Sequence, residues 1–209
     1  MHCAPVLTIL SQPLVSAGHA VAVLDYTRCP GLDLAGITQQ VERGLAWLLE
    51  EAAGRKMKVF LSGHSAGSHL AAMVLSSTWF SGLPPSHRER VGGVVHLSGI
   101  FHLPPLLSTS VNIPAMNLNP STADLLSPVT ESNLGRLAEA GRHVKHLVVV
   151  GQHDSPAFKE QARQYTDLLR ARHVKVILTE QGGEDHFSLV EKLKDEDYTL
   201  TREIIDFMK

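Results

Sequence analysis

Short runs of apolar, often β-branched residues alternate along the chain with longer stretches in which apolar residues recur every three or four positions. The short runs predict strands, and the longer stretches predict amphipathic helices. The expected strands are residues 20–25, 58–62, 91–97, 146–151 and 174–179. The expected helices are residues 34–53, 65–77, 156–172 and 198–208. This alternation is typical of a mostly parallel sheet with helices on both faces, so we expect an α/β fold.

Residues 99–130 interrupt the alternation. The segment is too apolar for a linker and too long for an ordinary connection between elements. Long ordered insertions usually have a function, so we expect a partly helical cap over a site within a single domain of 209 residues. The alternative is a surface excursion without a role.

Composition and charge exclude several classes of protein. With 44% apolar and 19% charged residues, the chain can fill the core of one globular domain. Lys+Arg 19 against Asp+Glu 21 gives a net charge of −2 without any basic block, so neither nucleic acid nor an anionic membrane is an expected partner. Residues 1–10 do not read as a signal peptide, and no apolar run approaches membrane-spanning length.

The two cysteines, Cys3 and Cys29, form neither a disulfide framework nor a metal-ligand spacing. We therefore expect a reducing, cytosolic environment, with the nucleus as a second location, and no metal site.

The clearest chemical motif follows the expected strand at residues 58–62. Residues 63–67 read Gly-His-Ser-Ala-Gly and lead into an apolar helical stretch. Strand, G-x-S-x-G and helix thus follow in the order of a nucleophile elbow, in which a strained turn exposes the hydroxyl of Ser65. The alternative is an ordinary turn between a strand and a helix.

The other residues of this motif have their own expected roles. Gly63 and Gly67 are expected because a side chain at either position collides with the neighbouring strand or helix. Ala66 is expected to offer its backbone N–H to an oxyanion at the positive end of the helix dipole. His64 is expected to be a packing or surface residue, because it lies beside Ser65 in the chain and not across from it.

A serine hydroxyl is a poor nucleophile at neutral pH, so it needs a histidine base and a carboxylate that holds the tautomer of that histidine. Asp154 follows the expected strand at residues 146–151 and is the expected acid, because open α/β sheets bind ligands at the carboxyl ends of their strands. Its alternative role is the N-cap of the next helix. His186 follows the last expected strand in a glycine-bearing loop and is the expected general base. Its neighbours Glu184 and Asp185 are expected to be solvated loop residues.

Three segments together resemble the kynurenine formamidase family: GHSAGSHLAAMVL (63–75), LVVVGQHDSPAF (147–158) and EDHFSLVEKL (184–193). The first is shared by many esterases, but the combination is narrower, and the similarity runs from about Pro13 to the last residue. The resemblance implies the α/β-hydrolase fold. It also implies hydrolysis of N-formyl-L-kynurenine to L-kynurenine and formate in tryptophan breakdown, without metal or organic cofactor.

The mechanism implied by the resemblance uses the same three side chains. Ser65 attacks the formyl carbon, His186 moves the proton to the departing aryl amine, and Asp154 stabilises the imidazolium. A formyl group needs almost no acyl pocket, whereas an aromatic leaving group needs an apolar slot. Residues 101–126 are expected to supply that slot, and Phe187 is either its second wall or a core aromatic.

The chain departs from the family at its start. The family has an H-G-G-Y-W motif upstream of the strand that matches residues 20–25, and the glycine amides of that motif complete the oxyanion hole. No such motif occurs here. The resemblance therefore implies an N-terminally truncated chain in which Ala66 acts alone and an interior strand is missing, unless residues 6–10 or the closing-up of neighbouring strands fill the gap. We expect such a chain to be less active and less stable than one with the missing segment.

Two other functions stay open at this point. A general carboxylesterase keeps the same triad and accepts longer acyl chains. A non-catalytic protein keeps the triad by descent and acts by binding, or by dimer formation with a full-length partner. The expected partner is a small-molecule substrate, with a homodimer as an additional possibility.

Overall fold

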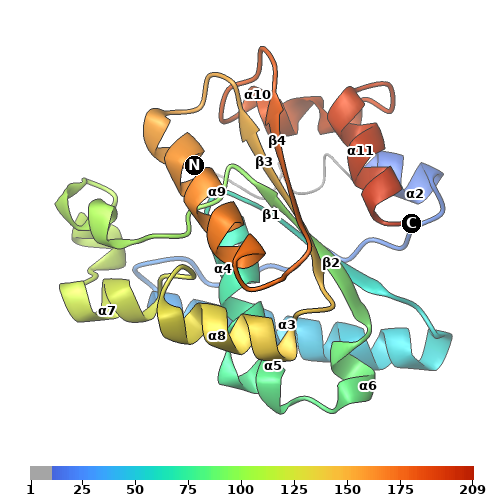
Figure 1. Cartoon of the computed structure of the whole chain (residues 1–209), viewed down its shortest axis with the longest axis horizontal. Coiled ribbons are helices and arrows are strands. Elements are labelled where there is room, and N and C mark those ends of the chain that lie inside the picture. The colour runs from blue at the N-terminus through green and yellow to red at the C-terminus, as the bar shows by residue number, and fades with distance from the viewer. Residues whose placement is uncertain (1–10) are drawn as a thin grey trace.

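The computed structural model describes residues 11–209 (Figure 1). Cys3 lies outside the described residues. So do residues 6–10, one of the two alternatives for filling the gap in the sheet.

Four parallel strands form the sheet in the order β1-β2-β3-β4. Consecutive buried valines and leucines form the inner strands, because helices cover both faces of a parallel sheet. Four expected strands are confirmed, although β1 ends, and β4 begins and ends, two residues later than predicted. The strands are β1 (Val59–His64), β2 (Val91–Leu97), β3 (Lys145–Gly151) and β4 (Val176–Gln181).

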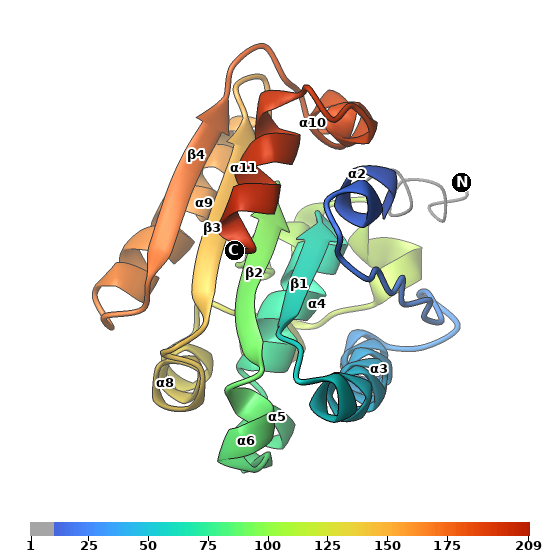
Figure 2. The same cartoon turned by 90° about the vertical axis from the view of Figure 1, so that its right-hand side faces the viewer.

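Two apolar cores lie on opposite faces of this sheet. The larger one packs against α3, α4, α8 and α9, and the smaller one packs against α2, α10 and α11. Figure 2 shows α11 on one side of the sheet and α4 and α9 on the other. The longer helices are α3 (Leu34–Arg55), α4 (Ala66–Leu75), α8 (Glu131–Ala140), α9 (Pro156–Arg170) and α11 (Thr199–Phe207). The short ones are α2 (Ser11–Ser16), α5 (Thr78–Gly82), α6 (Pro85–Arg88), α7 (Pro120–Leu125), α10 (Ser188–Glu191) and η3 (Lys192–Lys194).

The four helices predicted from the sequence are confirmed with small shifts at their ends. Within residues 11–209, none of the helices is both long and apolar enough to cross a membrane.

The strand predicted at residues 20–25 is wrong. Among the residues that the structure describes, this segment has no strand partner, and β1 is an edge of the described sheet. Val21 and Val23 are 37% and 46% exposed. A strand requires a hydrogen-bonded neighbour, and a cavity separates the segment from β1, so its β-type composition alone does not make it a strand.

The cavity between this segment and β1 has a volume of 660 Å³. Its walls come from residues 18–24, α3, β1 and α4, and most of the side chains that line it are apolar. Its position matches the gap that the resemblance implies between residues 20–25 and β1. Contributors to its walls include Val21, Leu24, Leu45, Leu48, Leu61 and Leu70.

Residues 99–130 are partly helical, as expected. They contain η1 (Pro104–Ser108), η2 (Asn112–Met116) and α7. Leu103 and Ala123 of this segment pack with Leu34 and Ile37 of α3 in a third apolar cluster. The segment is therefore anchored to the helical layer beside α4, next to the carboxyl edge of β1.

Buried histidines are an unusual feature of the interior. His96 of β2 and His146 of β3 are fully buried, with 3.2 Å between His96 Nε2 and His146 Nδ1. His96 Nδ1 lies 2.9 Å from the hydroxyl of Ser68 on α4. Burial lowers the pKa of His96 to about 3 and, together with the charge of His96, lowers the pKa of His146 well below its ordinary value. The buried His69 likewise has a pKa lowered by burial, to about 4, and its Nε2–H donates to the carbonyl of Leu126 at 2.7 Å.

Proline substitutions test whether residues 20–25 are paired. We expect Ala22→Pro to change the free energy of unfolding by less than about 1 kcal/mol, because no ladder hydrogen bond is lost there. The control Val94→Pro, in the interior strand β2, is expected to cost more than about 3 kcal/mol. Urea denaturation of both variants measures the difference, and a comparable loss in Ala22→Pro contradicts the unpaired assignment.

The buried histidines predict loss of stability in acid. Their pKa values are lower in the folded protein than in the unfolded chain, so the unfolded state binds more protons below pH 6.5. The stability that they confer is complete above that pH, and it falls by at most about 1.4 kcal/mol per pH unit for each histidine as the pH decreases toward the folded pKa. Urea denaturation between pH 7.5 and 5 measures this slope. His69→Gln is expected to make it shallower, and a flat profile for the unsubstituted chain contradicts the prediction.

Candidate active site

The turn between β1 and α4 places Ser65 at the carboxyl edge of the sheet. Ser65 has φ 53° and ψ −113°, a strained conformation for a residue with a side chain. Its backbone N–H donates to the carbonyl of Leu97 at 2.9 Å, which ties the turn to the end of β2. The geometry is that of a nucleophile elbow, with Ser65 directly before the first turn of a ten-residue helix.

The two glycines of the motif have different reasons to be glycine. A Cβ at Gly63 lies 2.3 Å from the backbone of Gly67, so a side chain there forces α4 away from β1. The same expectation for Gly67 is wrong, because a Cβ at that position meets nothing within 4 Å. Gly67 lines the cavity beside β1, so the described residues leave open space where a side chain was expected to collide.

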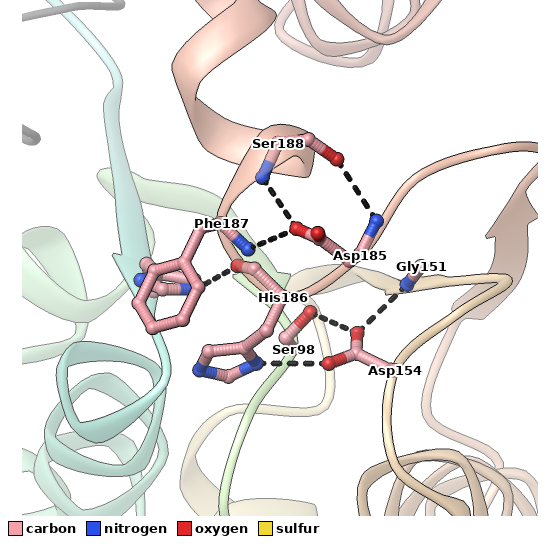
Figure 3. Close-up of polar contacts among 8 residues, drawn as sticks. Ser98, Gly151, Asp154, Asp185, His186, Phe187 and Ser188 are labelled. Carbon is pink, nitrogen blue, oxygen red and sulfur yellow. Dashed lines mark hydrogen bonds and ion pairs between the residues drawn. The ribbon is translucent and has the colours of Figure 1, made fainter.

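Asp154 and His186 meet at the same edge of the sheet (Figure 3). His186 Nδ1 lies 2.9 Å from Asp154 Oδ1, and the Asp154 side chain is fully buried while that of His186 is 20% exposed. A carboxylate only accepts, so Nδ1–H of His186 is the donor. In the neutral imidazole, Nε2 then carries the free lone pair, and it points away from Asp154 in Figure 3.

The second oxygen of Asp154 is held by two further donors. The Ser98 hydroxyl donates to Oδ2 at 2.6 Å, and the Gly151 N–H donates to it at 2.9 Å. The alternative role of Asp154 as a helix N-cap is wrong, because Ser155 occupies that position in α9. The carboxylate is instead directed inward, toward the histidine.

Ser98 was not found from the sequence. It follows β2 directly and has φ 44°. Its position could have indicated a role, because Ser98 is a polar residue directly after the carboxyl end of a parallel strand, as Asp154 is a few residues after another.

Aromatic rings enclose the imidazole of His186. The rings of Phe158 and His64 have their centroids 4.4 Å and 4.6 Å from it, and Phe187 meets it edge-on at 5.2 Å. Phe187 is 64% exposed, so it is a wall beside the base and not a core aromatic. These rings restrict the rotation of the imidazole and leave a small apolar surface around it.

The loop that carries His186 is shaped by its own side chains. Asp185 Oδ1 accepts from the backbone N–H groups of Phe187 and Ser188 at 2.9 and 2.8 Å, and these bonds lower the pKa of Asp185 (Figure 3). Glu184 is only 5% exposed and pairs with Lys192 at 2.7 Å, so its expected role as a solvated residue is wrong. In the described structure neither carboxylate bonds the imidazole, in agreement with the expectation that Asp154 is its partner.

The structure brings two of the three expected triad members into hydrogen-bond contact. Across residues 11–209, the hydroxyl of Ser65 has no hydrogen-bond partner. The relay between Ser65 and His186 stays a prediction, as does the role of the Ala66 N–H, which lies at the start of α4. Between residues 11 and 209, no group of three or more histidine, cysteine or acidic side chains is arranged to hold a metal ion.

A pair of alanine substitutions tests the geometry of the elbow. We expect Gly63→Ala to destabilise the fold by about 1–3 kcal/mol and to displace Ser65, because its Cβ overlaps the backbone of α4. Gly67→Ala is the matched control and is expected to be stable, since space is open there. Thermal unfolding measures both variants, and equal losses of stability contradict the account of Gly63.

Comparisons with known proteins concern the sequence and the fold of the chain. No protein-family model matches the chain. The chain is 35% identical to a kynurenine formamidase of Danio rerio over 92% of its own length and 64% of that protein. It is 33% identical to a kynurenine formamidase of Salmo salar over 95% of its own length and 66% of that protein. The chain thus spans just under two thirds of the length of these curated relatives.

Among solved structures, a carboxyl esterase of the fungus Tuber melanosporum matches with a TM-score of 0.70 at 17% identity. That match covers 96% of this chain and 69% of the esterase. At this identity the likeness concerns the fold alone. The chain therefore has the α/β-hydrolase fold, and the two relatives named above are kynurenine formamidases.

Proposed function

We propose that this chain is a serine hydrolase of the formamidase type, with Ser65 as nucleophile, His186 as general base and Asp154 as its orienting acid. The observation that carries the proposal is the buried Asp154–His186 hydrogen bond at the edge of the sheet where the strained Ser65 turn lies. A buried carboxylate that holds one histidine tautomer beside a nucleophile elbow is the arrangement that acyl transfer requires.

The proposed reaction has two acyl-transfer steps. His186 Nε2 accepts the proton of the Ser65 hydroxyl as Oγ bonds to the formyl carbon, and the carbonyl oxygen becomes an oxyanion beside the Ala66 N–H. The C–N bond then breaks, and His186 gives its proton to the departing aryl amine. Water, deprotonated by the same imidazole, attacks the formyl ester and releases formate and free Ser65.

The substrate class is N-formyl-L-kynurenine, and two observations support it. The similar proteins of known name are kynurenine formamidases. Phe158 and Phe187 flank His186, which is where an aromatic leaving group lies when His186 protonates its nitrogen. Residues 99–130, anchored beside α4, are proposed as the cap that completes this slot.

The proposed oxyanion site has one expected donor, the backbone N–H of Ala66. The chain has no H-G-G-Y-W motif, and one oxyanion donor is typically worth about 10²- to 10³-fold in kcat. We therefore expect slow turnover. A cytosolic location belongs to the same proposal, and the free Cys29 thiol is compatible with a reducing compartment.

A fluorophosphonate probe tests the proposed nucleophile directly. We expect stoichiometric labelling of Ser65 in the full chain and none in Ser65→Ala. Ser62→Ala, which removes an exposed hydroxyl three residues earlier on β1, is the matched control and is expected to label normally. Folded protein that does not label, or that labels equally in Ser65→Ala, contradicts the assignment.

Substrate preference separates a formamidase from a carboxylesterase. We expect hydrolysis of N-formyl-L-kynurenine. We also expect formyl esters of phenols to react faster than butyryl esters, because the proposed substrate carries a formyl group, which needs almost no acyl pocket. Faster turnover of the longer acyl esters favours the carboxylesterase.

A further inference from the structure

His64 forms a contact that its place in the motif did not predict. Its Nε2 lies 2.8 Å from the backbone carbonyl oxygen of His186. Within the described chain, this is the only hydrogen bond that joins β1 or α4 to residues 182–190. The imidazole rings of the two histidines also lie side by side, with their centroids 4.6 Å apart.

The direction of this hydrogen bond is determined by its acceptor. A carbonyl oxygen only accepts, so His64 carries its proton on Nε2 and donates it. His64 and Ser65 are adjacent in the chain, and His64 is the last residue of β1. One hydrogen bond therefore connects the backbone of the expected base to the residue that precedes the expected nucleophile.

Other hydrogen bonds tie the His186 loop to the turn that follows β3. The N–H of His153 donates to the carbonyl of Glu184 at 2.8 Å, and Asp154 accepts from the imidazole of His186. These bonds hold the loop against β3, and neither constrains its separation from the Ser65 turn. Among the hydrogen bonds of residues 11–209, only that of His64 spans this direction, beside the ring contact between His64 and His186.

His64 is also electrically suited to this position. Burial, and then the neighbouring His186, lower its pKa to about 4, so the ring is neutral at physiological pH. The groups that face it are His186 and Asp154. A neutral donor holds the loop without placing a positive charge next to His186, where a charge opposes formation of the imidazolium.

We infer that His64 is a positioning residue, which sets the separation of Ser65 and His186 by donating its Nε2–H to the His186 carbonyl. The inference rests on the proposed function. A displacement of about 1 Å between reacting groups can cost about 100-fold in rate, so one hydrogen bond in this direction has a large effect on catalysis.

Three substitutions separate the hydrogen bond from the packing of the ring. In His64→Gln the side-chain amide nitrogen reaches the position of Nε2, whereas in His64→Asn it reaches only that of Nδ1. His64→Leu keeps an apolar side chain and has no donor. Thermal unfolding of each variant checks that it is folded.

Two measurements are made on the chain of 209 residues. One is the rate at which a fluorophosphonate labels Ser65. The other is the far-downfield proton NMR resonance of the His186 Nδ1–H that is bonded to Asp154, assigned by its loss in His186→Gln. The second does not depend on catalysis.

We expect His64→Gln to label at nearly the wild-type rate and to keep the resonance. His64→Asn and His64→Leu are expected to label about 10- to 100-fold more slowly and to lose or broaden it. The inference is overturned if His64→Leu behaves as the wild type, or if His64→Gln is as impaired as His64→Leu. A wild type that keeps the resonance without labelling contradicts the proposed function alone, and the NMR comparison of the variants then decides the role of His64. A wild type with neither signal overturns both.

Discussion

The hydrogen bond between Asp154 and His186 is the interaction on which the site depends. A buried carboxylate is costly unless its oxygens are hydrogen-bonded, and here the Ser98 hydroxyl, the Gly151 N–H and the His186 imidazole supply the donors. Each donor comes from a residue at the carboxyl end of a parallel strand, or from the loop that follows it. Parallel pairing of the strands brings these ends together. It thereby places Asp154 beside His186, and this contact holds the proton of the imidazole on Nδ1.

The nucleophile turn depends on a second constraint, the close approach of β1 to α4. The backbone of Gly67 passes where a Cβ of Gly63 would lie, and the Ser65 N–H is bonded to the end of β2. These contacts fix the Ser65 backbone but do not reach the loop of His186. The His64 side chain joins the two segments, because its Nε2–H donates to the backbone carbonyl of His186. A histidine at this position of the motif supplies that donor.

The open edge of β1 is where this chain differs most from an ordinary doubly wound sheet. Residues 20–25 have the composition of a strand but line a cavity of 660 Å³ in place of pairing with a neighbour. The apolar side chains around that cavity gain only part of the stabilisation that close packing would give. Gly67 lies at this cavity, and a Cβ at its position meets no atom within 4 Å.

The sequence by itself determined the order of the elements, four of the five expected strands, the elbow at Ser65 and the residues Asp154 and His186. Hydrophobic periodicity and the residues that follow each strand are local features of the sequence. They are sufficient to locate candidate site residues here, because the carboxyl ends of parallel strands meet at one edge of the sheet. Only the tertiary structure decided that residues 20–25 are unpaired, that Glu184 is buried, that Ser98 holds Asp154 and that His64 donates to His186. The contacts of Ser98 with Asp154 and of His64 with His186 join residues more than fifty positions apart, and residues 20–25 border a cavity. Hydrophobic patterning along the chain carries no information about distant contacts, cavities or the burial of Glu184.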